Sequence, residues 1–280
     1  MRVLVTGANG QLGSELRVIA SADYLFTDIA ELDITNEDAV IAFVERNEID
    51  TIINCAAYTN VDMAEMEPAV AECVNTTAVA LLARVARRYK ARLIHISTDY
   101  VFGGESYETP IKESAAPAPL GVYGRTKLLG VRLIEESGCE YIIIRTSWLY
   151  STYGKNFVKT ILRLAAERDE LRVVNDQIGS PTYAKDLARV IVQICERRGF
   201  EPGVYHYSNR GEISWCDFAR AIMEISGAEC RVVPCTTAEY GAKAPRPAYS
   251  VLDTSKIRAC LGCEISDWRV SLAECINQML

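Results

Sequence analysis

Val3-Leu-Val-Thr-Gly7-Ala-Asn-Gly10-Gln-Leu-Gly13 joins an apolar run to three closely spaced glycines. The run before Gly7 has the pattern of a buried strand, and residues 11–20 have the periodicity of a helix. The glycines therefore fall on a strand-to-helix turn. Gly7 permits the tight turn, Gly10 lets the backbone approach a pyrophosphate, and Gly13 lets the helix pack closely on the strand. This context predicts a dinucleotide-binding site.

The rest of the first half alternates short strand patterns with longer helical ones. We expect strands at residues 2–6, 24–27, 51–54, 92–97 and 141–145, with helices at 11–20, 36–46, 68–90 and 122–137 between them. Such alternation is typical of an α/β fold with a doubly wound parallel sheet, the Rossmann arrangement. Ligands bind beyond the carboxyl ends of the strands in sheets of this kind.

The pattern loosens after about residue 150. Helices are expected near 156–167, 184–198, 214–226 and 266–280. We therefore predict a dinucleotide-binding Rossmann domain over residues 1–150, with returning segments near 171–208. Residues 151–280 are predicted to form mainly a smaller C-terminal α/β lobe that binds substrate.

Composition narrows the class of protein. The 280 residues are 49% hydrophobic and 24% charged with a net charge of −7, and no basic run suggests a nucleic-acid surface. No run reaches the roughly 18 apolar residues of a membrane span. Ten scattered cysteines and a strand in place of a signal peptide favour a reduced, cytoplasmic protein. The pair Cys260 and Cys263 has half the spacing of a metal site, but nothing completes it, so no metal is expected.

Acidic residues follow the second predicted strand. Asp28 lies 21 residues after Gly7, where a carboxylate would accept hydrogen bonds from the adenosine ribose. No Arg or Lys follows it before Arg46, which favours NADH over NADPH. Asp33 and Ile34 either flank the adenine or belong to a plain helix start.

A hydroxyl, a phenol and an ammonium form the predicted catalytic set. Tyr123 and Lys127 share one helix face at a spacing of four residues, and Thr98 ends a strand. A nearby Lys charge, together with the nicotinamide end of the cofactor, would lower the phenol's pKa and suit it to acid–base work, while Thr98 would hydrogen-bond a carbonyl oxygen. His95 and His206 each stand alone in predicted strands and are interpreted as structural.

Several motifs spread over nearly the whole chain carry a resemblance. They include Val5-Thr-Gly-Ala-Asn-Gly-Gln-Leu-Gly13, Ser97-Thr-Asp-Tyr-Val-Phe102, Tyr123-Gly-Arg-Thr-Lys127, Arg145-Thr-Ser-Trp148, Asp176-Gln-Ile-Gly-Ser-Pro-Thr182 and Arg246-Pro247. On these residues the chain resembles the dTDP-4-dehydrorhamnose reductase family of the extended short-chain dehydrogenase/reductase superfamily.

The resemblance implies reduction of the C4 ketone of dTDP-4-dehydro-6-deoxy-L-mannose to dTDP-L-rhamnose, a step toward surface polysaccharide. It makes Thr98, Tyr123 and Lys127 the catalytic set and Asp99 and Trp148 candidates for the sugar pocket. Arg246 is implied to contact the substrate diphosphate, with a loop-stabilising role as the alternative. The implied cofactor contacts are Gly7, Gly10, Gln11, Leu12, Gly13, Asp28, Asp33, Ile34, Ala56, Ala57, Tyr58, Tyr123 and Lys127.

The resemblance leaves some choices open. The family often has a basic residue after the position of Asp28, whereas this chain has Ile29, so the choice between NADH and NADPH stays open. The rival functions are another sugar-nucleotide 4-ketoreductase or epimerase, and a non-catalytic regulatory subunit of methionine adenosyltransferase. The exact sugar, a homodimer, a role for Mg in assembly and the C-terminal residues that contact the base are not fixed by the sequence.

Overall fold

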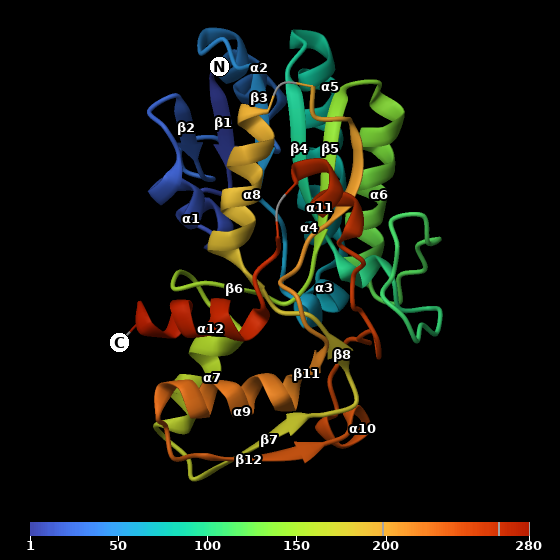
Figure 1. The fold of residues 1–280 in the computed structure, drawn as a ribbon. Coiled ribbons are helices and arrows are strands. Elements are labelled where there is room, and N and C mark those ends of the chain that lie inside the picture. Colours follow the sequence, from blue (N-terminus) through green and yellow to red (C-terminus); the bar gives the residue numbers. More distant parts are fainter. Residues whose placement is uncertain (198, 263, 280) are drawn as a thin grey trace.

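The computed structural model describes residues 1–197, 199–262 and 264–279. Its centre is a sheet of six parallel strands in the order β10-β5-β4-β3-β1-β2 (Figure 1). The order reverses at β1, as in doubly wound sheets. The strands are β1 (Val3–Thr6), β2 (Tyr24–Thr27), β3 (Thr51–Asn54), β4 (Arg92–Thr98), β5 (Glu140–Thr146) and β10 (Gly203–His206). The predicted fold class is confirmed, because all five strand pairs are parallel.

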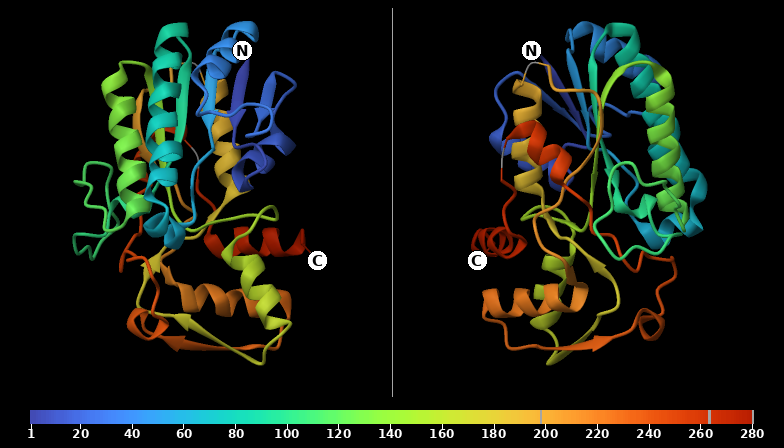
Figure 2. Two further views of the ribbon diagram at one scale, coloured as in Figure 1. Left: turned by 180° about the vertical axis from the view of Figure 1, so that it is seen from behind. Right: turned by 45° about the vertical axis from the view of Figure 1, so that its right-hand side comes forward.

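Helices cover both faces of this sheet, as the two further views show (Figure 2). One face packs against α1 (Gln11–Ile19), α8 (Ala184–Glu196) and α11 (Ser255–Leu261), and the other against α2 (Glu37–Arg46), α5 (Ala78–Tyr89) and α6 (Val122–Ser137). Alternate residues of each strand enter the two cores. Val3 and Val5 lie in the first core, while Leu4 lies in the second. Burial on both faces explains why the strands read as continuous apolar runs.

The connection from β3 to β4 is more broken than the single predicted helix. It contains α3 (Val61–Met66), α4 (Pro68–Glu72) and a π-helical turn, Cys73–Thr77, before α5. The turn places Asn75 so that its amide accepts from the Tyr58 N–H at 2.9 Å and donates to the Tyr58 carbonyl at 3.0 Å. A π turn inside a helix commonly marks such a local requirement. Here it fixes the loop that leaves β3.

The helical run Pro68–Tyr89 is long and apolar enough to cross a membrane by length and composition. More than half of its most apolar window is buried inside the fold. A core helix of a globular protein passes the same test, so this run is weak evidence for a membrane.

A second group of elements lies beyond the carboxyl ends of the sheet strands, at the bottom of Figure 1. Its main elements are α7 (Phe157–Ala165), β7 (Glu170–Val174), α9 (Trp215–Ser226), β12 (Arg231–Cys235) and α12 (Trp268–Asn277). Shorter ones are β6 (Leu149–Tyr150), β8 (Ile178–Gly179), β9 (Thr182–Tyr183), β11 (Ile213–Ser214) and α10 (Thr237–Tyr240). A 3-10 turn, Asp99–Val101, directly follows β4 and packs against α6. The group has its own apolar core, which contains Phe218, Ile222 and Leu272. The chain passes back to the sheet for α8 and β10 and again for α11.

Candidate functional site

A cavity of about 940 Å³ lies where the carboxyl ends of β1, β3, β4 and β5 meet α6, α7 and α9. This is the place where ligands bind in doubly wound sheets. It brings together most of the residues that the sequence nominated. These are Gly7, Gly10, Gln11, Leu12, Gly13, Asp28, Asp33, Ile34, Ala56, Ala57, Thr98, Asp99, Tyr123, Lys127 and Trp148.

The glycine turn is shaped for close approach of backbone. Gly7 has a φ of +65°, and a Cβ there would lie 2.6 Å from the Ala56 backbone nitrogen. A Cβ at Gly13 would lie 2.5 Å from the carbonyl oxygen of Gly7. The turn can therefore hold β1, the loop after β3 and α1 together only without side chains at these positions.

The helix that follows this turn begins without a cap. Gly10 is the N-cap residue of α1, no side chain caps its N–H groups, and the first turn contains no acidic residue. The first N–H groups of a helix lack partners inside the helix and attract anions. These features fit the pyrophosphate of a dinucleotide.

We expect Gly7→Ala to unfold far more readily than the wild-type protein. The new methyl group would combine a disfavoured positive φ with a clash against rigid backbone, which together cost at least about 2–4 kcal/mol of unfolding free energy. Gly227→Ala is the matched control, because Gly227 has a φ of +72° but nothing lies within 4 Å of its Cβ position. Urea denaturation of both variants separates the two contributions. Equal losses would show that the contact with Ala56 is unimportant.

Asp28 ties the glycine turn to β2. Its Oδ2 accepts from the Asn9 N–H at 2.8 Å, and its own N–H donates to Glu31 at 2.9 Å. Ile29 beside it is 75% exposed. Asp33 lies further along the same wall, where its Oδ1 accepts from the N–H and hydroxyl of Thr35. This side of the cavity is therefore acidic, and the hydrogen bonds of Asp28 and Asp33 also hold the loop after β2 in place.

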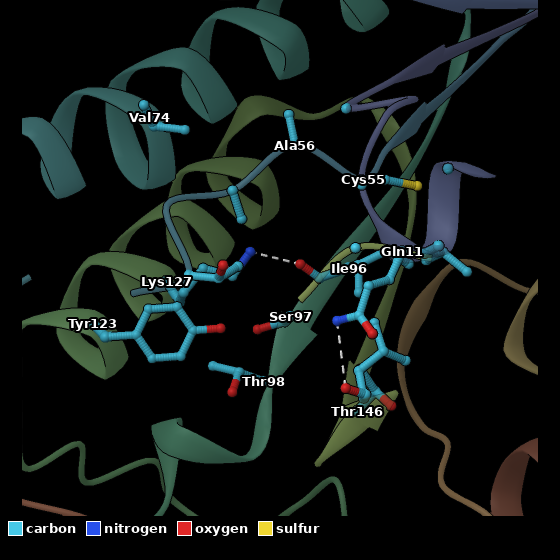
Figure 3. Close-up of a pocket in the computed structure, with 18 of the residues that line it drawn as sticks. Gln11, Cys55, Ala56, Val74, Ile96, Ser97, Thr98, Tyr123, Lys127 and Thr146 are labelled. Atoms are coloured by element: carbon cyan, nitrogen blue, oxygen red, sulfur yellow. Dashed lines mark hydrogen bonds between the residues drawn. The ribbon is translucent and has the colours of Figure 1, made fainter. Parts of the chain in front are cut away.

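Tyr123 projects from the start of α6 toward the end of β4 (Figure 3). Burial raises the pKa of its phenol to about 12, and the interaction with the Thr98 hydroxyl offsets only part of this rise. Lys127 is not among the groups that shift this pKa here, and its Nζ donates to the Ile96 carbonyl at 2.6 Å. At neutral pH the phenol therefore keeps its proton. The joint effect of Lys127 and a bound nicotinamide on the pKa of Tyr123 stays a prediction.

Lys127 lies deeper in the same wall and is only 2% exposed. Burial lowers the pKa of its amine to about 7. Its second polar neighbour is His95 Nε2, at 3.4 Å from Nζ. A side chain interpreted as a purely structural strand residue thus touches a predicted catalytic group.

Asp99 adjoins Thr98 and is also almost fully buried. Burial raises the pKa of its carboxyl to about 6. One carboxyl oxygen accepts from the Thr98 hydroxyl at 3.1 Å, while the buried Oδ2 has no hydrogen-bond partner. The Ser250 hydroxyl lies close enough to the Asp99 carboxyl to lower its pKa slightly, and Oδ2 can still accept from a hydroxyl group of a ligand.

Two nominated residues do not line the cavity. The Tyr58 hydroxyl donates to Glu67 at 2.7 Å. Arg246 makes an ion pair with Asp62 at 2.9 Å and donates to the Ala244 carbonyl. These two contacts of Arg246 correspond to the loop-stabilising role that the sequence analysis gave as its alternative.

Trp148 belongs to an aromatic cluster whose other members were not predicted from the sequence. Its ring stacks on Trp215 with centroids 3.6 Å apart, and Phe157 packs against Trp215 from another side. Trp148 has a φ of +47°, an uncommon value for a bulky residue. Trp215 lies 67 positions later in the chain, at the start of α9, and no local pattern could have paired it with Trp148.

The described residues contain no cluster of three or more His, Cys, Asp or Glu side chains that could hold a metal ion. Nine cysteines in this part of the chain are free thiols, and Cys260 is one of them. Cys263, its partner in the close-spaced pair, lies outside the described residues.

Comparison with known proteins places this cavity in a family context. The family model described as the RmlD substrate binding domain matches residues 1–280. The chain belongs to the RmlD family. A dTDP-4-dehydrorhamnose reductase of Aggregatibacter actinomycetemcomitans is 44% identical over 97% of this chain and 97% of its own length.

Solved structures of RmlD relatives agree closely with the fold. A dTDP-4-dehydrorhamnose reductase from Clostridium acetobutylicum has a TM-score of 0.95 and 40% identity, covering 100% of this chain and 99% of its own. One from Bacillus anthracis, in complex with NADP, has a TM-score of 0.94 and 40% identity, covering 99% of each chain.

Proposed function

We propose that this protein reduces the C4 ketone of dTDP-4-dehydro-6-deoxy-L-mannose to dTDP-L-rhamnose, with a reduced nicotinamide cofactor. The observation that carries this proposal is a single cavity that holds both an uncapped, glycine-lined helix start and a protonated phenol beside Thr98. The names of the RmlD relatives support the choice of substrate.

The catalytic roles follow from the contacts. When bound, the nicotinamide would supply the hydride that adds to the carbonyl carbon. Tyr123 would donate its proton to the developing alkoxide, since a phenol with a pKa of about 12 remains protonated at neutral pH. Thr98 would orient the carbonyl oxygen. Asp99 and Trp148 would bind the sugar, and Lys127 would hold ribose hydroxyls with the N–H that it has left.

The remaining assignments concern cofactor and architecture. Residues 1–150 would form the dinucleotide-binding unit together with returning segments near 171–208, and residues 151–280 would supply most of the substrate lobe. The cofactor contacts would be Gly7, Gly10, Gln11, Leu12, Gly13, Asp28, Asp33, Ile34, Ala56, Ala57 and Tyr58. Tyr58 would act by fixing the loop after β3 beside the cofactor, because its hydroxyl is directed to Glu67 and its backbone N–H and carbonyl are bonded to Asn75. Arg246 would act by holding its loop through Asp62.

The wall around Asp28 supports a preference for NADH. Two carboxylates, Asp28 and Glu31, lie at the end of β2, and the next residue, Ile29, brings no positive charge for a 2′-phosphate. The complex of the Bacillus anthracis relative contains NADP. The cofactor preference of this chain is tested by comparing kcat/KM for NADH with kcat/KM for NADPH.

We expect Asp28→Ala to reduce the NADH-to-NADPH ratio of kcat/KM about ten-fold, because the repulsion of a 2′-phosphate and a ribose acceptor are lost together. The ratio is the proper measure, since loss of the contact with Asn9 would weaken both cofactors. Asp23→Ala, at the opposite end of β2, is the control. An unchanged ratio in Asp28→Ala would remove this residue from the ribose site.

The function itself is tested by assaying the purified protein with NADH and NADPH against dTDP-4-dehydro-6-deoxy-L-mannose and other 4-keto sugar nucleotides. We expect oxidation of the cofactor matched by formation of dTDP-L-rhamnose. Faster turnover of another 4-keto sugar nucleotide would favour the rival ketoreductase. Tightly retained NAD⁺ without net turnover would favour an epimerase, and binding to methionine adenosyltransferase without turnover would favour the regulatory subunit.

Such a reaction uses soluble metabolites and a reduced cofactor, which supports a cytoplasmic site. Nine free thiols among the described residues suit that compartment. A homodimer remains a prediction, which sedimentation of the purified protein can test.

A further inference from the structure

A row of buried polar side chains crosses three neighbouring strands next to residues that line the cavity. Thr6 on β1 is the register partner of Asn54 on β3, and Asn54 is the register partner of His95 on β4. At most 1% of each residue is exposed. All three side chains point to the same face of the sheet. Two residues earlier in each strand, this face carries the apolar side chains Leu4, Ile52 and Leu93.

The row is hydrogen-bonded from end to end. The Thr6 hydroxyl donates to Asn54 Oδ1 at 2.7 Å, and Asn54 Nδ2 lies 3.0 Å from His95 Nδ1. His95 Nε2 then lies 3.4 Å from Lys127 Nζ. Buried polar groups are normally hydrogen-bonded, and these bonds connect the row to Lys127, which lines the cavity.

The direction of each bond can be assigned from chemistry. The Ala56 backbone N–H, which can only donate, points at Asn54 Oδ1 from 3.2 Å. The Asn54 amide nitrogen must therefore be the atom that faces His95 Nδ1, and it donates to that nitrogen. An Nδ1 that accepts from Asn54 carries no proton, and burial keeps the pKa of His95 well below its usual value, so the ring is neutral. Its single proton is thereby assigned to Nε2.

This assignment sets a condition on Lys127. An ammonium group has only donors, and it would face the Nε2–H of His95 with no acceptor between them. An uncharged amine has a lone pair that can accept this proton, while it still donates to the Ile96 carbonyl at 2.6 Å. The other titratable neighbours are the Cys55 thiol from the end of β3, whose pKa burial raises to about 12, and Tyr123 on α6. Neither provides a negative charge at neutral pH.

We propose that His95 is a positioning residue for Lys127: fixed by Asn54 with its proton on Nε2, it donates to the lysine and selects the uncharged amine in the ligand-free protein. This inference rests on the proposed function only in taking Lys127 as part of the site. It explains how a buried lysine is kept at the cavity without a carboxylate partner.

The tautomer of His95 can be measured on the unaltered protein. The chain has two histidines, and the structure assigns them opposite tautomers. His206 Nδ1 lies 3.0 Å from the Ile111 carbonyl, which only accepts, so His206 is protonated on Nδ1. Imidazole ¹⁵N spectra of the ligand-free full chain are expected to show one ring of each kind. The absence of a ring protonated on Nε2 alone would overturn the proposal, and so would a spectrum of His206→Asn in which the remaining ring carries its proton on Nδ1.

A second measurement reads the charge of Lys127. In protein labelled with ¹³C at lysine Cε, the Lys127 signal, assigned by its loss in Lys127→Met, is titrated without ligand. His95→Gln offers a carbonyl oxygen where the wild type offers an N–H, so the ammonium gains an acceptor. We expect the titration midpoint to rise by at least one pH unit, a ten-fold change in protonation.

Thr6→Val is the matched control for this titration. It removes one polar group from the same row, but the Ala56 N–H still fixes Asn54, so the midpoint should not move. An unchanged or lower midpoint in His95→Gln would show that His95 merely fills space. Both measurements are made without turnover, so a failure of the proposed reaction and a failure of this inference are distinguishable.

Discussion

Tyr123→Phe is expected to lower kcat for ketone reduction by about a thousand-fold, within the range that general acid catalysis contributes. The substitution removes one oxygen and its proton and keeps the ring, which packs edge-on against Tyr100 with centroids 5.4 Å apart. The dissociation constant of the cofactor should change by less than about two-fold. Stopped-flow measurement of cofactor oxidation, together with fluorescence titration of cofactor binding, checks both parts.

A suitable control for this variant is Tyr141→Phe. Tyr141 loses the same oxygen at the opposite end of the sheet, near the start of β5. Its turnover should match that of the wild type. Normal turnover in Tyr123→Phe would rule out the phenol as the proton donor, whatever the cofactor affinity.

Lys127→Met is expected to have two opposite effects, a loss of activity of about a hundred-fold or more and a gain in stability at neutral pH. The gain arises because burial lowers the pKa of Lys127 from 10.5 to about 7 in the folded protein. Below pH 10 the unfolded chain takes up a proton that the folded protein accepts only near pH 7. Stability is therefore lost as the pH falls through this interval and is fully present above it.

The size of the gain follows from the shift and its offsets. Each pKa unit corresponds to about 1.4 kcal/mol. The variant loses the hydrogen bond to the Ile96 carbonyl and leaves the buried Nε2–H of His95 without its acceptor, which together cost about 2–3 kcal/mol. We expect a net gain of about 1–3 kcal/mol in unfolding free energy at pH 7. Urea denaturation at pH 7 and at pH 10.5 checks it, because the gain should vanish at the higher pH.

Lys112→Met, at an exposed lysine, should show no such dependence on pH. A gain of equal size at both pH values for Lys127→Met would mean that packing, and not the charge, is responsible. In that case the floor of the cavity does not oppose a positive charge.

Local patterns were sufficient for much of the fold. The predicted strands at 24–27 and 51–54 coincide with β2 and β3, and the helix at 122–137 coincides with α6. These segments carry their own signal in apolar runs and in periodicity. By contrast, the local pattern predicted a strand around His206, but it could not predict that this strand, β10, pairs with β5 across some 60 residues of the chain.

The same distinction holds at the site. The glycine turn and the pair Tyr123 and Lys127 are visible in the sequence because their spacing along the chain is meaningful. The direction of the Lys127 side chain cannot be read from the sequence, because it depends on contacts with the Ile96 carbonyl on β4 and with His95. The stacking of Trp148 on Trp215 and the pairing of Arg246 with Asp62 are likewise products of tertiary structure.

The chain returns to the sheet after residue 150, and this bears on whether the first 150 residues can fold alone. Helix α8 and strand β10, which follow residue 150, contribute Leu187, Ile191 and Tyr205 to the core between α1 and the sheet. A fragment that ends near residue 150 would lack these side chains, so apolar residues of α1 and of the sheet would be exposed to water. The first 150 residues are therefore not expected to fold as a separate unit, because part of their core is supplied by later segments of the chain.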